Sequence, residues 1–495
     1  MRCAALGDSL RHKGANVTFV MREATPAMEE LLQTLGHGTV RLPDAGLRRV
    51  SGWRAAPWET DASQTLEVLV AQGEVAWLIV DHYGIDDRWE ERIRRAGCKL
   101  LVIDDLAASR HSCDALLNQN LLADAEDRYR SLVSRDCRLL LGPRFALLRE
   151  EFRAARSRLH RDARRVRKLL VFLGGGDPDG VTLQVLTVIA MVRPDDLEVD
   201  VVVGAGNPHR AEIEKHCAYK KGYRVIPQSS DMAGLMLDAD LAVGAGGVST
   251  WERCCLGLPA VVVAIAENQE EVSRAAAEAG VCIYLGPSRE VTPEMFAAAF
   301  RLVIGNAGMR KLLSEAGTKL VDGMGSERVA RILLQRPVRV RPARSEDGER
   351  LFGWRNAEAT RCHSHDSAPL NLKSHLQWLR DCLEGDSRAL LVGEDEGTPV
   401  GALRYDLGRG VATVSIYLDP ALQGRGYGPR LLLAGEAWLR TAKPEFRSVR
   451  AEITAANDAS RRAFEEAGFR MSGYLFGKRL DTEPANGGHK DTSAQ

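Results

Sequence analysis

Short apolar runs alternate with helical patterns along the first 335 residues of the chain. Seven runs consist almost entirely of apolar residues, which is typical of parallel strands buried on both faces: residues 17–21, 77–80, 100–103, 168–173, 197–203, 241–243 and 260–264. A basic helical stretch at residues 148–167 separates two sets of these runs. The pattern predicts two Rossmann-like lobes, residues 1–150 and 151–335, that face each other across a cleft.

The last third of the chain shows a different pattern. Residues 338–348 indicate a strand that turns into a helix, residues 411–418 a strand, and residues 431–439 a helix. A polar and basic linker at residues 335–342 leads into this part, which predicts a further α/β domain at residues 338–481. Residues 482–495 are polar and lack aromatic side chains, so we expect a disordered tail.

Composition narrows the class of protein. A chain of 495 residues is too long for one core. Its 67 Lys and Arg residues balance its 67 Asp and Glu residues, which argues against a nucleic-acid or anionic-membrane partner. The ten cysteines show no paired metal spacing, and neither a signal peptide nor an apolar run of about 18 residues is present. We therefore expect a cytoplasmic enzyme without a metal; its oligomeric state is not readable from the sequence.

A glycine-rich loop, Gln-Gly-Arg-Gly-Tyr-Gly, lies between the strand at 411–418 and the helix at 431–439. Glycines let the backbone approach an anion, and a helix N-terminus offers unpaired N–H groups. Strand, loop and helix together resemble the pyrophosphate loop of GNAT-family N-acetyltransferases, which implies acetyl-CoA as co-substrate. The expected acetyl-CoA-binding residues are Gln423, Gly424, Arg425, Gly426, Tyr427, Gly428 and Asn457.

Other segments extend this resemblance. Residues 457–469 look like the closing helix and strand of the GNAT family, and residues 354–356 and 375–379 resemble acetyltransferases that act on amino-sugar nucleotides. Many relatives place a tyrosine four residues after the serine corresponding to Ser460, where it protonates the CoA thiolate, but this chain has Phe464. The resemblance leaves Tyr474 or solvent as the acid. Glu452 ranks first as general base, with His363 and His365 as alternatives.

A second anion-binding turn occupies residues 244–252, where small residues precede a helix. It resembles the UDP site of GT-B nucleotide-sugar enzymes, with Glu252 placed to accept ribose hydroxyls. Residues 268–269 match that family's sugar-side loop, and residues 174–177 form another flexible turn in the cleft. The expected UDP-sugar-binding residues are Asp177, Gly246, Gly247, Ser249, Thr250, Glu252, Asn268 and Gln269.

Four ordered segments, residues 80–83, 102–106, 118–120 and 141–149, resemble the UDP-sugar hydrolases of pseudaminic acid synthesis. The resemblance implies that water attacks the sugar C1 of UDP-2,4-diacetamido-2,4,6-trideoxy-β-L-altropyranose and releases UDP. It also places Tyr83 in the cleft as a catalytic residue. We expect Asp81 and His82 to be structural, with Asp81 capping the next helix, whereas Asp104 and Asp105 could cap or orient.

The N-terminus departs from that family. Its members open with a strand and a Gly-x-Gly-His loop, whose histidine is the expected base, before an Arg-Cys pair; this chain begins at Met1, directly before Arg2 and Cys3. We hypothesise that the start codon is placed too late. As written, the chain should expose neighbouring strand edges and apolar faces, leave His12 on the surface, and bind and hydrolyse UDP-sugar poorly.

Together the resemblances imply a bifunctional nucleotide-sugar enzyme. The C-terminal domain would N-acetylate a UDP-4-amino-sugar with acetyl-CoA, and the front lobes would then release UDP. Two alternatives remain open: an acetyltransferase with an inactive UDP-sugar-binding front part, and a GT-B glycosyltransferase. The sugar stereochemistry, of pseudaminic or legionaminic type, also remains open.

Overall fold

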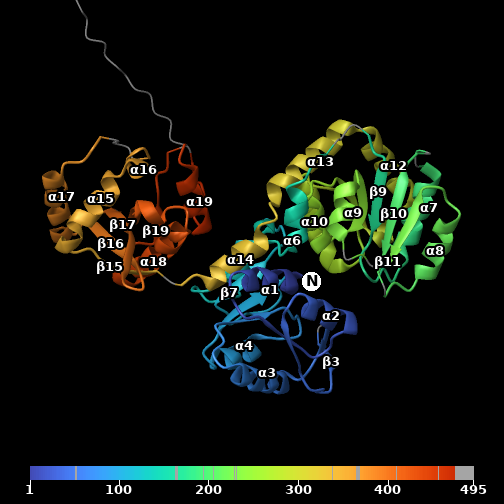
Figure 1. The fold of residues 1–495 in the computed structure, drawn as a ribbon, viewed down its shortest axis with the longest axis horizontal. Helices are drawn as coiled ribbons and strands as arrows, with labels where there is room; N and C mark the ends of the chain where they lie inside the picture. The colour runs from blue at the N-terminus through green and yellow to red at the C-terminus, as the bar shows by residue number, and fades with distance from the viewer. Residues whose placement is uncertain are drawn as a thin grey trace, which may run out of the picture. The chain divides into compact units, whose positions relative to one another are not determined.

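The computed structural model describes residues 1–473 apart from residues 51–52, 162–164, 193, 195, 205, 228, 230, 337, 364–367, 409 and 455. The chain divides into two compact units, Met1–Leu334 and Gln335–Gln495 (Figure 1). The first unit holds two lobes built on parallel strands, and the second holds a mixed sheet. This confirms the predicted fold class, a GT-B-like pair of Rossmann-like lobes followed by a further α/β domain.

The second lobe of the first unit contains a six-stranded parallel sheet in the order β11-β10-β9-β12-β13-β14. Because the chain runs outward from β9 in one direction and from β12 in the other, the sheet has a switch point between these strands, where ligands bind in such folds. The strands are β9 Lys168–Phe172, β10 Glu198–Val203, β11 Tyr223–Pro227, β12 Leu241–Ala245, β13 Ala260–Ala264 and β14 Ile283–Pro287.

Helices cover both faces of this sheet, and each face has its own apolar cluster. The helices are α6 Glu150–Arg156, α7 Val181–Val192, α8 Arg210–Ala218, α9 Met232–Asp238, α10 Val248–Cys255, α11 Glu270–Glu278, α12 Pro293–Gly305 and α13 Ala307–Leu320. Four predicted runs are confirmed as β9, β10, β12 and β13. The edge strands β11 and β14 were not predicted, because they are only half-buried and mix polar with apolar residues.

The first lobe contains a four-stranded parallel sheet, β5-β6-β7-β8, and two separate strand pairs, β1-β2 and β3-β4. Its strands are β1 Thr18–Met21, β2 Gly38–Arg41, β3 Arg48–Val50, β4 Trp53–Ala55, β5 Trp77–Val80, β6 Lys99–Ile103, β7 Ala115–Asn118 and β8 Arg138–Leu141. Its helices are α1 Arg2–His12, α2 Pro26–Thr34, α3 Trp58–Gln72, α4 Asp87–Arg94 and α5 Ala125–Arg130. The helix α14, Gly325–Leu334, returns to this lobe and buries Val329 and Leu333 with Leu6 and Leu10 of α1.

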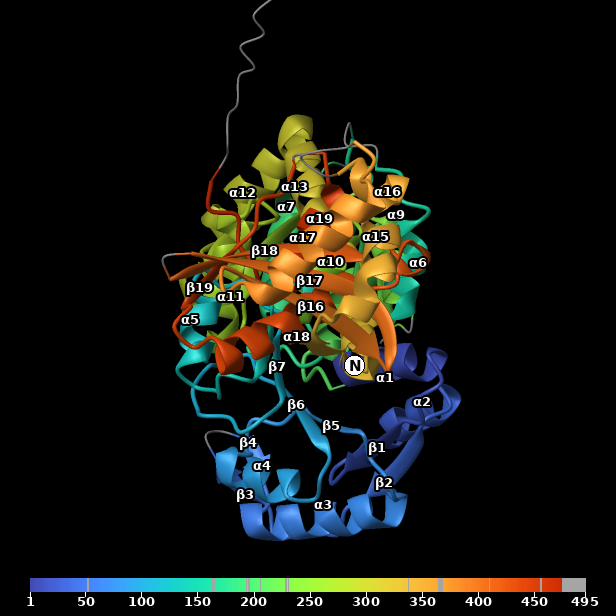
Figure 2. The same ribbon diagram turned by 90° about the vertical axis from the view of Figure 1, so that its left-hand side faces the viewer.

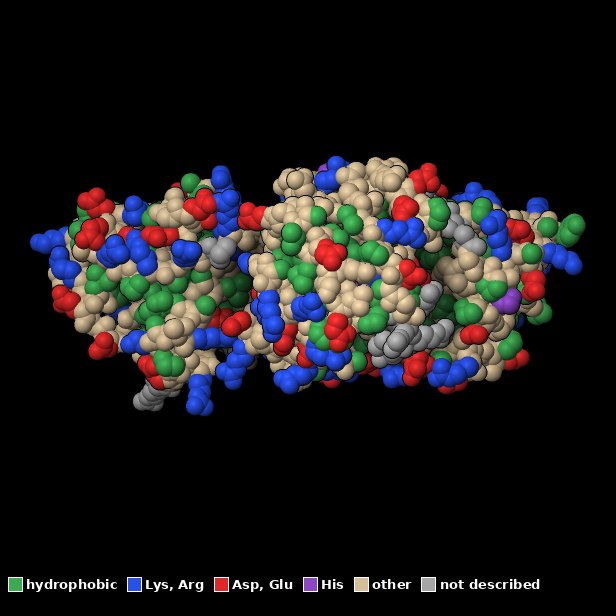
Figure 3. All heavy atoms as spheres, turned by 90° about the horizontal axis from the view of Figure 1, so that it is seen from below, with side chains coloured by type: hydrophobic (Ala, Val, Ile, Leu, Met, Phe, Trp, Pro, Cys, Tyr) green, Lys and Arg blue, Asp and Glu red, His purple; other side chains and the backbone are tan. Residues whose placement is uncertain are grey.

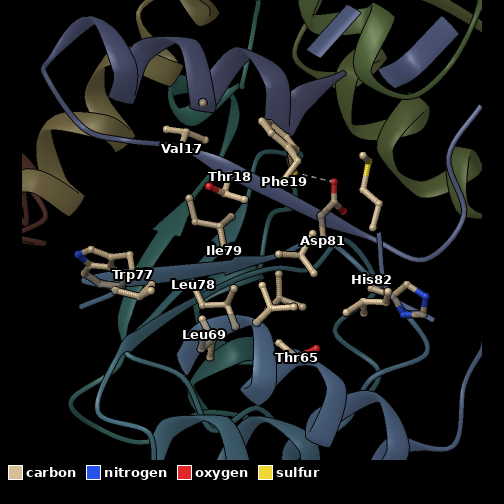
Figure 4. Close-up of a pocket in the computed structure, with 18 of the residues that line it drawn as sticks. Val17, Thr18, Phe19, Thr65, Leu69, Trp77, Leu78, Ile79, Asp81 and His82 are labelled. Atoms are coloured by element: carbon tan, nitrogen blue, oxygen red, sulfur yellow. Dashed lines mark hydrogen bonds between the residues drawn. The ribbon is translucent and has the colours of Figure 1, made fainter. Parts of the chain in front are cut away.

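The parallel sheet of the first lobe is interrupted between β1 and β5. Within the described part of the chain, no strand pairs with the edges that β1 and β5 turn toward each other, and Figure 2 shows the β1-β2 pair standing apart from β5 and β6. A cavity of about 960 Å³ separates them. Val17 and Phe19 line one side and Leu78 and Ile79 the other (Figure 4). The first lobe therefore has the unpaired strand edges, on β1 and β5, and the apolar faces that we expect from the sequence.

The second unit contains a five-stranded sheet in the order β15-β16-β17-β18-β19, antiparallel except for the last pair. Its strands are β15 Arg339–Pro342, β16 Arg388–Asp395, β17 Thr398–Gly408, β18 Val411–Leu418 and β19 Ser448–Arg450. Its helices are α15 Gly348–Asn356, α16 Glu358–Arg361, α17 Leu372–Glu384, α18 Tyr427–Ala442 and α19 Asp458–Glu466. Helices α18 and α19 pack on one face, and α15 and α17 pack on the other.

The surface, the helices and the titratable side chains add three general observations. On the face shown in Figure 3, Lys and Arg side chains are interspersed with Asp and Glu side chains and do not gather in one basic area. Within the part of the chain that the structure describes, no helix combines the length and apolarity that a membrane span requires. The described residues also contain no group of three or more His, Cys, Asp and Glu side chains that could hold a metal ion.

Candidate functional site

The turn between β12 and α10 is shaped by glycines. A Cβ atom on Gly246 would lie 2.5 Å from Ser273 Oγ, and one on Gly244 would lie 2.6 Å from Arg253 Nη1, so neither position accepts a side chain without displacement. Gly247 precedes α10 with φ of 90°, a conformation that favours glycine. The turn lies at the switch point of the sheet and presents the unpaired N–H groups of the α10 N-terminus, which favour an anion.

The two hydroxyls of this turn differ in burial. Ser249 is half-buried, whereas Thr250 is 2 % exposed. Both hydroxyl oxygens accept hydrogen bonds from the buried Arg253, at 3.2 Å for Ser249 Oγ and 3.1 Å for Thr250 Oγ1. Of the two, Ser249 is the one that a ligand in the cleft can reach. Arg253 is a residue that sequence reasoning missed, because its contacts are set by the depth of the helix in the lobe.

The remaining residues of the expected UDP site lie around this turn. Glu252 is half-buried, and burial raises the pKa of its carboxyl although Arg149 opposes the shift. Asn268 is exposed on the short helix Glu267–Gln269, and Gln269 Oε1 accepts from the Ile265 N–H at 3.1 Å, which anchors that loop.

Asp177 is placed differently from the expectation. It is 1 % exposed, and its two carboxylate oxygens accept from the N–H groups of Val181 at 2.9 Å and Thr182 at 2.8 Å. These bonds cap the start of α7. Its carboxylate therefore holds the glycine turn after β9 and is not directed at a ligand.

Four side chains of the first lobe form a charged network at the carboxyl ends of β5 and β6. Arg2 binds Asp81 through two nitrogens, at 2.6 and 3.0 Å, and reaches Asp105 at 2.6 Å and the Tyr83 hydroxyl at 3.1 Å. The Tyr83 hydroxyl donates to Asp105. Burial and the Asp105 carboxylate raise the pKa of Tyr83, so its phenol keeps its proton and acts as a hydrogen-bonding group.

This network corrects the expectation for Asp81. Its carboxylate pairs with Arg2 and accepts from Cys3 Sγ at 3.3 Å, and the following helix α4 is capped by Asp86 instead. The network also continues into the second lobe: Asn120 Nδ2 donates to Asp105 at 3.0 Å, and Trp251 of α10 donates to Asn120 Oδ1 at 3.4 Å. Sequence reasoning missed Arg2 and Asn120, because their partners are distant along the chain.

Asp104 belongs to a separate buried cluster. Its oxygens accept from the N–H groups of Leu106 and Ala107 and from Tyr129, and one of them lies 3.7 Å from His111 Nε2. His111 Nδ1 lies 2.8 Å from Glu90, which is 1 % exposed. Burial opposes protonation of His111, but the carboxylates of Asp104 and Glu90 outweigh it and raise the pKa of His111 to about 9.

We expect this cluster to make stability pH-dependent. The folded pKa of His111 lies above the unfolded value of about 6.5, so the stabilisation is complete below that pH and is lost as pH rises toward 9. The free energy of unfolding should fall by about 2–3 kcal/mol across this window. Urea titrations at pH 6 and pH 9.5 measure it. His111→Gln should remove the fall, whereas His12→Gln, which changes an exposed histidine, should keep it; an unchanged fall in His111→Gln contradicts the assignment.

In the second unit, the loop before α18 also depends on glycines. Gly424 and Gly426 have φ values of 73° and 79°, and Gly426 is the residue that precedes α18. Gln423, Gly424 and Arg425 are exposed, so the backbone of the loop is accessible to an anion. Gly428 is buried, and a Cβ atom there would lie 3.2 Å from Ala463. The Tyr427 hydroxyl donates to Asp395 at 2.9 Å, which fastens the loop to the end of β16.

Strands β18 and β19 part beside this loop. Their pairing is limited to Val411–Thr413 with Ser448–Arg450, and residues 414–418 of β18 have no described partner strand on that side. The diverging strands leave backbone N–H and C=O groups next to the glycine loop. An extended molecule with an anionic end fits this arrangement.

Comparison with known proteins identifies the second unit. The model of the acetyltransferase (GNAT) family matches residues 349–469. The putative phosphinothricin acetyltransferase YwnH of Bacillus subtilis is 33% identical over 136 residues, which cover 25% of this chain and 81% of YwnH. The second unit belongs to the GNAT family.

The first unit is similar to sugar-handling proteins. The glycosyltransferase family 28 C-terminal domain matches residues 170–307. The spore coat polysaccharide biosynthesis protein SpsG of Bacillus subtilis is 35% identical over 210 residues, 42% of this chain and 61% of SpsG. The UDP-2,4-diacetamido-2,4,6-trideoxy-beta-L-altropyranose hydrolase of Campylobacter jejuni is 28% identical over 217 residues, 43% of this chain and 74% of the hydrolase. The chain thus spans about three-fifths of SpsG. The predicted fusion of a unit similar to nucleotide-sugar enzymes with a GNAT domain is confirmed.

The residues expected to act as base and acid in the GNAT domain are only partly within the described residues. Glu452 is exposed and lies beyond the end of β19 at Arg450, so the expectation that it sits on that strand is wrong by two residues. His363 is also exposed. Tyr474 and His365 lie outside the described residues. Tyr417, on the diverging part of β18, was missed by sequence reasoning, and burial raises the pKa of its phenol.

Two further positions of the GNAT domain have clear structural roles. Asn457 caps α19, since its Oδ1 accepts from the Ser460 N–H at 3.0 Å. Phe464 is 4 % exposed and packs edge-to-face on Phe469, with ring centroids 4.9 Å apart. The phenylalanine at this position therefore belongs to the core under α18, and it has no proton to donate.

Proposed function

We propose that the chain carries out two consecutive reactions on a UDP-linked amino-sugar. The GNAT domain acetylates the 4-amino group with acetyl-CoA, and the first unit hydrolyses the resulting UDP-2,4-diacetamido-2,4,6-trideoxy-L-altrose. The observation that carries this proposal is the fusion itself: an N-acetyltransferase domain is joined to a unit similar to a hydrolase whose substrate bears two acetamido groups. Acetylation is the chemistry that produces an acetamido group from an amine.

For the acetyl transfer, the glycine loop and the N-terminus of α18 would hold the CoA pyrophosphate. The φ values above 70° at Gly424 and Gly426 support this fit, because two positions of the loop carry no Cβ atom and Gly424 is exposed with open space around it. The substrate amine attacks the thioester carbonyl, the C–S bond breaks, and the thiolate leaves. We propose Glu452 as the group that accepts the amine proton and keep Tyr474 as the candidate acid for the thiolate.

For the hydrolysis, the turn before α10 would hold the UDP diphosphate, with Ser249 as a donor and Glu252 as acceptor for the ribose hydroxyls. Water attacks the sugar C1, the bond from C1 to the phosphate oxygen breaks, and UDP leaves with the electron pair. Tyr83 lies at the carboxyl ends of β5 and β6, and its protonated phenol would have to release Asp105 in order to donate to the leaving phosphate. Both reactions use metabolites of the cytoplasm, and neither requires a metal, a nucleic acid or a membrane.

A second candidate is an acetyltransferase whose first unit binds UDP-sugar without hydrolysing it. One observation favours it: Asp81, Tyr83 and Asp105 each accept a hydrogen bond from Arg2, and Tyr83 donates to Asp105, so the phenol and both carboxylates already have partners. Because the first unit is similar to glycosyltransferase family 28, a glycosyltransferase is the third candidate.

We expect the full chain, incubated with acetyl-CoA and a UDP-4-amino-sugar, to form an N-acetylated sugar and then free UDP with a reducing sugar. NMR of the sugar C1 and acetyl signals follows both steps. Acetylation that leaves the UDP linkage intact would support the binding role of the first unit. Transfer of the sugar to an added acceptor would support the glycosyltransferase. Absence of acetylation would overturn the proposal for the GNAT domain.

A further inference from the structure

Arg253 is a buried cation with an unusual set of partners. It lies on α10, directly behind the glycine turn, and is 3 % exposed. Its guanidinium donates to Ser249 Oγ at 3.2 Å, to Thr250 Oγ1 at 3.1 Å and to the Ala245 carbonyl at 2.9 Å. Among the described residues, no carboxylate forms an ion pair with it, and the Glu252 carboxylate acts on its charge without contact. The three oxygens that accept its hydrogen bonds are all neutral.

This arrangement is energetically demanding, because a buried charge is costly unless it is paired. Burial lowers the pKa of Arg253, yet a guanidinium keeps its proton in proteins. The fold makes room for the group: Gly244 has no side chain where the guanidinium lies, since a Cβ atom there would be 2.6 Å from Nη1. The structure thus places a full positive charge under the turn and, among the described residues, gives it no carboxylate as an ion-pair partner.

The hydrogen bonds of Arg253 determine what the hydroxyl of Ser249 can do. A hydroxyl carries one donor and two acceptor sites, and here the guanidinium occupies an acceptor site. Without this donor, a serine in the first turn of a helix commonly turns its hydroxyl to a nearby backbone group. With it, the Ser249 hydroxyl keeps its proton for a second partner, such as an anion at the N-terminus of α10.

We propose that Arg253 is a positioning residue that holds the Ser249 hydroxyl as a donor and adds positive charge for a multiply charged anion, a nucleoside diphosphate. The inference rests on the proposed function of this turn as the UDP site. The new element is that Arg253 lets the site distinguish charged from uncharged nucleosides although Arg253 does not itself contact the ligand.

The test measures binding of UDP and of uridine to the full chain by isothermal titration. Arg253→Met, which keeps length and apolar volume, should weaken UDP binding by about tenfold or more. Uridine binding should change by less than about twofold, because uridine lacks the phosphates. Arg253→Lys, which keeps the charge with a different geometry, should recover part of the UDP affinity.

A double-mutant cycle with Ser249→Ala separates positioning from folding. If Arg253 acts through the hydroxyl, Arg253→Met should weaken UDP binding less in the Ser249→Ala background than in the unchanged chain. Fully additive effects, or equal losses for UDP and uridine, would overturn the inference. If Arg253→Met does not fold, Ser249→Ala alone decides: unchanged UDP affinity overturns the inference. Absence of UDP binding to the unchanged chain would instead refute the proposed function, and the inference with it.

Discussion

Replacing Gly426 by valine is expected to lower kcat/KM for acetyl transfer by about 100-fold or more, because two effects combine. A β-branched residue is strained at the φ of 79° that Gly426 adopts, and its Cβ atom would lie 3.3 Å from Gln335 Nε2, which crowds the residue that directly precedes α18. The pyrophosphate would lose close contact with the N–H groups at the start of α18. The rate at which the CoA thiol is released, measured with a chromogenic disulfide over a range of acetyl-CoA concentrations, gives kcat/KM.

Gly410→Val is the matched control. Gly410 has a φ of 77° and no neighbouring atom within 4 Å of an added Cβ, and it directly precedes β18, at the end of that strand opposite to the glycine loop. The same backbone strain is therefore introduced in the same domain, away from the glycine loop. We expect this variant to lose stability while keeping most of its activity. An equal loss of kcat/KM in both variants would show that the effect of Gly426→Val arises from folding.

Adding an apolar strand ahead of Met1 is expected to stabilise the first lobe strongly. The cavity of about 960 Å³ lies between the β1 and β5 edges, and Met1 and Asp81 both line it (Figure 4). A strand parallel to β5 that ends beside Asp81 can therefore continue through a short turn into α1. Each buried apolar side chain contributes about 1.5–3 kcal/mol against about 1–2 kcal/mol for ordering its backbone, and new ladder hydrogen bonds add to this. We expect a net gain of about 2–5 kcal/mol in the free energy of unfolding.

The experiment compares the chain that starts at Met1 with a version that carries five β-branched apolar residues and a glycine-containing turn before Met1. Guanidinium titration followed by tryptophan fluorescence includes a signal from this lobe, because four of the eight tryptophans, Trp53, Trp58, Trp77 and Trp89, belong to it. An extension of equal length with prolines at alternate positions is the control, since proline cannot pair with both edges. Equal stability of the two extended chains would contradict the idea that the cavity accepts a strand.

Local sequence patterns determined much of this protein. Runs rich in apolar residues identified β9, β10, β12 and β13, because a strand buried on both faces tolerates few polar residues, and they also identified the half-buried β18. The two glycine turns were also recognisable, since a strand, a turn without Cβ atoms and a helix are contiguous in the chain. Half-buried edges such as β11 and β14 have no such signature.

Only the tertiary structure decided which side chains meet. Arg2 is 79 residues from Asp81 and 103 from Asp105, so neither spacing nor periodicity could reveal their network. Asp177 looks like a cleft residue in the sequence but caps α7, because the backbone after β9 turns its carboxylate inward. In the sequence, Arg253 looks like an ordinary basic residue on the surface of a helix. Its buried place under the anion turn follows from the packing of α10 in the second lobe, a long-range property that the sequence pattern does not encode.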